Sequence, residues 1–157
     1  MGKNWGFTLM EVLVSVFVLA VGLLGLAALQ ANVVKYNHSA ELRSLAVLQA
    51  EAMIDRMRVN QTGVAGGVYN NLSGIPSSPP DCTSSTCTMS QIATRDLYDW
   101  NAENARLLPA GQGTTVGNGS LFTVTVRWDN GRTGAVGTDC SGDLNVDLSC
   151  LIVGVEL

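Results

Sequence analysis

Histidine, basic residues and charged residues in general are scarce in this chain of 157 residues. Charged residues make up 14%, with nine Lys and Arg against 13 Asp and Glu, and the net charge is −4. So few charges argue against a disordered chain and against a highly charged coiled coil. The scattered basic residues offer nucleic acid no basic face. Histidine is the usual side chain in metal sites and in acid–base catalysis, and the chain has only one, His38. The sequence therefore argues against both kinds of site.

One segment, by contrast, is strongly apolar. Residues 7–29 read FTLMEVLVSVFVLAVGLLGLAAL and contain a single charge, Glu11. At about 1.5 Å per residue this segment makes a helix of about 35 Å, enough to cross a hydrocarbon core of about 30 Å. Lys3 precedes the segment, so the positive-inside tendency predicts a cytoplasmic N-terminus and an exported polar body.

Four cysteines lie in the predicted exported body, and an even number there indicates disulfides. Of the three possible pairings we expect the two local ones, Cys82 with Cys87 and Cys140 with Cys150. The alternative is a zinc site, but these spacings are not those of zinc motifs and no histidine is near. We therefore expect no metal and no cofactor.

The front of the apolar segment combines a glycine, an aromatic residue and a carboxylate. Gly6 directly precedes Phe7, and Glu11 lies four residues further on. A carboxylate within an apolar helix costs at least a few kcal/mol unless it has a partner; the simplest alternative places Glu11 at the lipid headgroups. A secretory signal peptide would have a shorter apolar run followed by a cleavage site. Residues 25–27 form only a passable one.

Residues 6–12, GFTLMEV, resemble the class III signal of type IV prepilins and pseudopilins, in which a short leader ends in glycine before an apolar helix. The resemblance implies that a membrane prepilin peptidase cuts after Gly6 and N-methylates Phe7. It also implies that Glu11 pairs with the Phe7 ammonium of a neighbouring subunit. Such a pair would neutralise a costly carboxylate and set the axial register of packed helices.

Residues 12–30 are similar to the helix of PilV-type minor pilins, and short stretches at 82–87, 91–93, 96–100, 107–111 and 122–128 follow the order found in that family. The resemblance implies a minor pilin that takes part in type IV pilus assembly, in initiation or in a tip complex, and supports pilus biogenesis, twitching motility and adhesion. It implies a single-pass, N-in protein of the bacterial inner membrane that later enters the pilus fibre at the cell surface.

The partners implied by this resemblance are other minor pilins, the major pilin, the prepilin peptidase, the inner-membrane assembly platform and membrane lipid, with no nucleic acid. One alternative is a minor pseudopilin of a type II secretion system. Another, from a different class, is an exported enzyme or binding domain with an uncleaved anchor. The sequence shows no phosphate-binding loop and no Ser/His/Asp arrangement, so we do not expect an enzyme.

Helical patterns dominate the first part of the body. Residues 30–59 are predicted to continue the helix as an amphipathic half, and Gly63 to end it. Residues 63–87 are predicted to be a loop. Thr88 and Gln91 form the capping box of a second helix that Pro109 stops. The apolar face of the first helix consists of Leu42, Leu45, Ala46, Ala50, Met53 and Met57.

The sequence pattern of the C-terminal part predicts β-strands. Alternation over residues 121–129 predicts a half-buried strand, Asn130 and Gly131 a two-residue hairpin turn, and residues 150–157 another strand. Asp139, Asp143 and Asp147 lack the spacing of a calcium loop and are predicted to lie in a solvated acidic loop.

The expected fold is α+β, with a long N-terminal helix packed on a small antiparallel sheet, as in type IV pilins. The expected organisation has four parts. They are a cleaved leader (residues 1–6), a transmembrane and assembly helix (7–29), its amphipathic continuation (30–59) and a globular head (60–157).

Overall fold

The computed structural model describes residue 6 and residues 8–157. The chain divides into two compact units, Met1–Ala40 and Glu41–Leu157. Helix α1, Leu9–Val59, runs through both units and has 51 residues. A single helix of this length was expected, because no proline and no mid-helix turn signal interrupts its sequence.

The α1 helix ends at Val59, the last residue of the predicted helix, but Asn60 and not Gly63 ends it. Asn60 leaves the helical conformation, and its side chain accepts a hydrogen bond from the Gly63 N–H at 3.2 Å, which starts the short helix α2, Gln61–Ala65. Gly63 therefore lies inside α2, where a Cβ would come within 2.6 Å of the Asn60 amide. Asparagine competes for backbone groups at a helix end as effectively as glycine.

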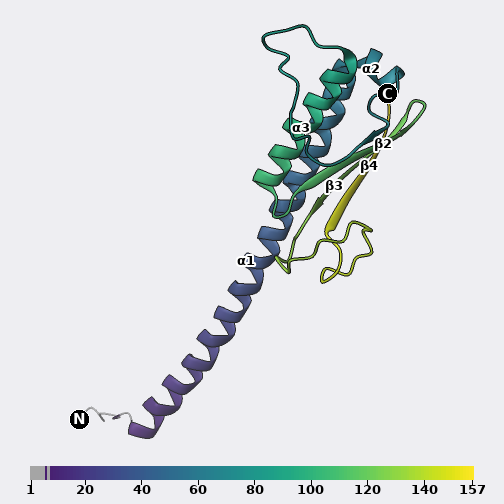
Figure 1. Cartoon of the computed structure of the whole chain (residues 1–157). Coiled ribbons are helices and arrows are strands. Elements are labelled where there is room, and N and C mark those ends of the chain that lie inside the picture. Colours follow the sequence, from purple (N-terminus) through teal and green to yellow (C-terminus); the bar gives the residue numbers. More distant parts are fainter. Residues whose placement is uncertain (1–5, 7) are drawn as a thin grey trace. The chain divides into compact units, whose positions relative to one another are not determined.

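Helix α3, Met89–Leu107, begins at the predicted capping box. The Thr88 side chain accepts from the Gln91 N–H at 3.3 Å, and the Gln91 side chain accepts from the Thr88 N–H at 2.9 Å. The helix ends before Pro109, as predicted. Figure 1 shows α3 alongside the C-terminal part of α1.

A four-stranded antiparallel sheet completes the head, in the order β1-β2-β3-β4. Its strands are β1, Asn71–Leu72; β2, Gln112–Asn118; β3, Leu121–Trp128; and β4, Ser149–Glu156. This arrangement confirms the predicted α+β class and the two predicted strands. Strands β1 and β2 were not predicted, and β1 lies within the segment that was expected to be a loop.

A turn forms at Asn130 and Gly131, where the Arg132 N–H donates to the Asp129 carbonyl at 3.3 Å, but the predicted β-hairpin across it does not form. Strand β3 forms its hairpin with β2, through residues 119–120, where Gly119 has a φ of +64°. After β3 the chain makes a long loop instead, because the Asp129 carboxylate accepts hydrogen bonds from the N–H groups of Thr133 (3.0 Å) and Gly134 (2.8 Å). These bonds hold the pKa of Asp129 below its usual range, although burial by itself would raise it.

The loop between β3 and β4 is less solvated than predicted. Asp129 and Asp147 are 7% and 5% exposed, so Asp147 does not belong to a solvated acidic loop. The Asp147 carboxylate accepts from the Ser141 N–H at 3.0 Å, and bonds from Ser141 hold its pKa below its usual range. Both carboxylates therefore organise the loop from inside, which offsets the cost of burying them.

The core of the head lies between the two long helices and one face of the sheet. Met53 and Met57 from α1, Trp100 from α3, and Phe122 and Val124 from β3 are at most 2% exposed. The predicted apolar face of α1 is confirmed from Leu42 onward, so Met53 and Met57 are core residues.

A buried asparagine joins α3 to β2. Asn101 is 1% exposed; its carbonyl oxygen accepts from the Gly113 N–H at 2.6 Å, and its amide donates to the Gly113 carbonyl at 3.0 Å. One side chain thus makes the two bonds that a neighbouring strand would make. Gly113 is required there for a second reason, since a Cβ would lie 2.2 Å from the Trp100 ring.

Candidate assembly site

The first turn of α1 is built by a threonine cap. The Glu11 N–H donates to the Thr8 carbonyl (3.0 Å) and to Thr8 Oγ1 (3.3 Å). This Thr-x-x-Glu arrangement places Glu11 in the first turn, where the positive end of the helix dipole favours a carboxylate. Gly6 is exposed, with open space around its Cα. Phe7 lies outside the described residues, so its processing and its pairing with Glu11 stay predictions.

Glu11 is exposed, and among the residues that the structure describes its carboxylate makes no hydrogen bond or ion pair. Ser15 Oγ donates to the Glu11 backbone carbonyl at 2.7 Å and does not contact the carboxylate. A carboxylate at the front of an apolar helix is costly in lipid without a counter-charge. The described part of the chain supplies no such counter-charge to Glu11.

The helix that follows exposes its apolar side chains all round. None of the described residues before Leu42 is buried, and Leu9, Phe17 and Leu24 are 84%, 66% and 72% exposed. The helix is long and apolar enough to cross a membrane. A helix that is apolar on every side requires lipid or other helices around it. This surface and Glu11 together make a candidate assembly site.

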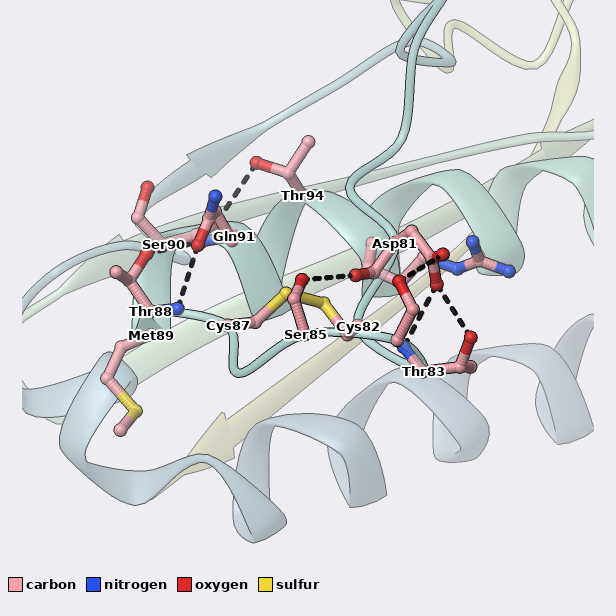
Figure 2. The surroundings of a disulfide bond; sticks show 12 residues. Asp81, Cys82, Thr83, Ser85, Cys87, Thr88, Met89, Ser90, Gln91 and Thr94 are labelled. Atoms are coloured by element: carbon pink, nitrogen blue, oxygen red, sulfur yellow. Dashed lines mark hydrogen bonds between the residues drawn. A yellow bond between two sulfur atoms is a disulfide. The ribbon is translucent and has the colours of Figure 1, made fainter.

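The head carries two disulfides, Cys82–Cys87 and Cys140–Cys150, with Cα–Cα distances of 5.4 and 5.7 Å. The structure thus contains both predicted local pairs. Figure 2 shows the first disulfide directly ahead of the Thr88 cap, with Asp81 at its other side. Asp81 accepts from the Thr83 N–H (3.0 Å) and hydroxyl (2.6 Å), and hydrogen bonds from Thr83 and Ser84 hold its pKa well below its usual range.

Removing either disulfide is expected to destabilise the head. Replacing Cys82 and Cys87 together by alanine should lower the free energy of unfolding by about 2 kcal/mol, and replacing Cys140 and Cys150 by about 3 kcal/mol, because the second pair closes the longer loop. Urea denaturation of the full chain in detergent measures both losses. Non-reducing peptide mapping of the wild type is the control, and free thiols or a Cys82–Cys140 link would contradict the pairing.

A buried polar network, which the sequence did not reveal, links α1, α3 and the segment before β1. The Tyr69 hydroxyl donates to Asp96 at 2.6 Å and accepts from the Asn60 amide at 3.1 Å, while Arg56 donates to Asp96 at 3.1 Å. Tyr69 is fully buried, and burial and then the Asp96 hydrogen bond raise its pKa. These hydrogen bonds connect the C-terminal end of α1 to α3 and to the segment before β1. No group of carboxylate, histidine and cysteine side chains in the described part of the chain could hold a metal ion.

Comparison with known proteins adds two findings. Residues 28–98 match the family of the type IV pilin Tt1218, and residues 3–27 match the prokaryotic N-terminal methylation motif. The two matches support a pilin role. No curated protein and no solved structure matches the chain.

These matches support the coarser part of the sequence interpretation. The chain is similar to a type IV pilin over residues 28–98 and carries a methylation motif over residues 3–27, and both findings fit a pilin role. The methylation motif, followed by one long apolar helix, fits membrane anchoring before entry into a pilus. The PilV-type and minor-pilin assignments remain predictions.

Proposed function

We propose that this protein is a minor pilin of the PilV type that takes part in type IV pilus assembly, in initiation or in a tip complex, and so supports pilus biogenesis, twitching motility and adhesion. One observation carries the proposal. The methylation motif at residues 3–27 contains most of the exposed apolar part of α1 and its one carboxylate, and the type IV pilin match begins at residue 28.

The proposed processing follows from the first residues. Residues 1–6 are the leader, and the peptidase cuts after Gly6. N-methylation of Phe7 keeps its charge, so the new ammonium can pair with Glu11 of a neighbouring subunit. In an apolar environment this pairing is worth more than in water, and both charges are costly when left alone.

The proposal also covers the organisation of the chain, its cellular location and its partners. Residues 7–29 are the transmembrane and assembly helix, 30–59 its continuation and 60–157 the head, with the N-terminus in the cytoplasm. The protein is anchored in the inner membrane before assembly and then enters the fibre. Its proposed partners are other minor pilins, the major pilin, the prepilin peptidase, the inner-membrane assembly platform and lipid. It has no proposed catalytic role and no nucleic-acid partner.

The location of the protein in the fibre tests this proposal. Pili are sheared from cells that carry a tagged chain, and the tag is quantified in fibres and in membranes, followed by cross-linking and mass spectrometry. We expect the protein in the fibre fraction, cross-linked through its head to other pilins. Its confinement to the membrane in cells that make normal pili would contradict the proposal, as would cross-links to the components of a type II secretion system.

A further inference from the structure

Strand β4 is a long, open edge of the sheet. It has eight residues, SCLIVGVE, and pairs on one side with β3 over its whole length, from Trp128↔Ser149 to Leu121↔Glu156. The opposite edge of the sheet is the two-residue strand β1. Short edge strands resist pairing with other chains, whereas long ones invite it.

The register determines which backbone groups of β4 point outward. The Leu157 N–H donates to the Ser120 carbonyl at 2.9 Å, which makes residues 157 and 120 a hydrogen-bonded pair. Because such pairs alternate in an antiparallel ladder, Leu151, Val153 and Val155 bond to β3. The N–H and C=O groups of Cys150, Ile152, Gly154 and Glu156 then face away from the sheet. In the described part of the chain no hydrogen bond uses these outward backbone groups.

The edge lacks the features that usually prevent strand pairing. It contains no lysine, no proline and no bulge in its register, the devices that blunt natural edges. Ile152 is 59% exposed, and nothing lies within 4 Å of the position that a Cβ on Gly154 would occupy. Outward N–H and C=O groups that repeat every second residue match another extended strand, not a helix or a small ligand. The occupant is therefore an extended polypeptide.

Acidic groups lie at both ends of this edge. Glu156 is at one end, and its carboxylate accepts from the Ser120 hydroxyl at 3.3 Å. At the other end the Cys140–Cys150 disulfide attaches a loop, residues 133–148, in which Asp139 and Asp143 are exposed and Asp147 is buried; Arg132 directly precedes this loop. A bound strand with Lys or Arg at its ends would complement these charges.

Two arginines of other elements make polar contacts within the head. Arg127, opposite Cys150 in the register, donates to Thr114 Oγ1 (2.9 Å) and to the Thr138 carbonyl (3.1 Å). Arg58, which lines a cavity with Leu157, pairs with Asp55 at 3.0 Å. Both guanidinium groups therefore have acceptors within the head.

Charge also disfavours a second copy of this chain as the occupant. In the antiparallel register that uses all four outward residues of both β4 edges, Ile152 would lie opposite Gly154 and Glu156 opposite Cys150. Each Glu156 would then lie against the acidic loop of the other copy, at both ends of the interface. Parallel pairing would bring the two Glu156 side chains close together. Like charges in such positions are destabilising.

We propose that the outer edge of β4 binds an extended segment of a different protein, with β-branched or apolar residues at its centre and Lys or Arg at its ends. The segment would add a fifth strand to the sheet. The inference rests on the edge itself and does not depend on the proposed function.

Photocross-linking in cells tests this proposal. The full chain carries p-benzoylphenylalanine at position 152, or at position 116 as a control, because Val116 is equally exposed (59%) but lies on an inner strand. Gly154→Pro keeps the ladder with β3, since the Gly154 N–H points outward, but removes a donor and blocks the edge. Gly154→Ala retains the donor and is the matched control. The cross-linked segment is mapped by mass spectrometry.

We expect position 152 to cross-link to a segment of another protein that has alternating β-branched residues and basic ends. The yield should fall by about tenfold or more with Gly154→Pro and stay within about twofold with Gly154→Ala. Amide exchange in detergent checks the fold: the Leu151, Val153 and Val155 amides should stay protected in both variants. Equal cross-linking from positions 152 and 116, cross-links to a second copy, a helical or acidic partner segment, or insensitivity to Gly154→Pro would each overturn the proposal.

Discussion

Replacing Trp100 by alanine should destabilise the head by about 3–5 kcal/mol, a large share of the 5–15 kcal/mol that stabilises a typical domain. The Trp100 ring is 1% exposed, contacts the backbone of β2 at Gly113, and its Nε1 donates to the Gln49 carbonyl of α1 at 2.8 Å. One side chain thus joins α3, α1 and the sheet, and its removal leaves a cavity among all three.

Two variants make this prediction specific. Trp100→Phe keeps most of the ring and loses the hydrogen bond, so its loss should be smaller, about 1–2 kcal/mol. Tyr98→Ala removes a half-buried aromatic residue from the same helix and should cost less still. Urea denaturation of the full chain in detergent, followed by amide exchange of β3, measures the head separately from the apolar half of α1. Equal losses for Trp100→Ala and Tyr98→Ala would contradict this account of the core.

Replacing Glu11 by alanine should leave processing, folding and membrane insertion intact but sharply reduce entry into fibres. Insertion should even improve, because a carboxylate is removed from the apolar helix. In the fibre, however, one Phe7 ammonium would enter the packed helices unpaired, at a cost of about 3–5 kcal/mol for a buried pair that loses one partner. The measurement is the amount of this protein in sheared fibres relative to membranes, together with fibre number per cell.

The controls for Glu11 separate charge from shape. Glu11→Gln keeps the shape and some hydrogen bonding, so it should recover only part of the incorporation. Ser15→Ala removes the hydroxyl that bonds the Glu11 backbone carbonyl and leaves the carboxylate, so incorporation should remain near normal. If Glu11→Ala enters fibres at wild-type levels with unchanged fibre number, the register pair does not operate for this subunit.

The sequence predicted those parts of the head in which local signals and burial agree. The Thr88–Gln91 box begins α3, and the alternation in β3 places Phe122, Val124 and Val126 in the core. The prediction from sequence was wrong where contacts between residues far apart in the chain determine the secondary structure. Strand β2 has two glycines and reads as a turn, yet Gly113 is required by Trp100 and bonded by Asn101. A buried helical asparagine carries no signal in the sequence that it will bind a strand.

The hairpin predicted after β3 was wrong for a related reason. Asn130 and Gly131 favour a tight hairpin locally, but Asp129 binds two backbone N–H groups further along the chain, and the sheet is completed by β4. The candidate assembly site behaves differently. Its residues come from a short local motif, which the sequence displays directly. The proposed partner of Glu11 is the Phe7 ammonium of a neighbouring subunit, so this pairing stays a prediction.

The N-terminus of the mature protein tests the central claim most directly. Intact-mass analysis of the membrane-extracted chain should find a species that begins at Phe7 and carries one added methyl group. Gly6→Ala should slow removal of the leader, and a larger residue at that position should block it. A mature chain that still begins at Met1 in the wild type, or one cut behind the apolar run so that it begins at Ala28, would contradict the pilin account.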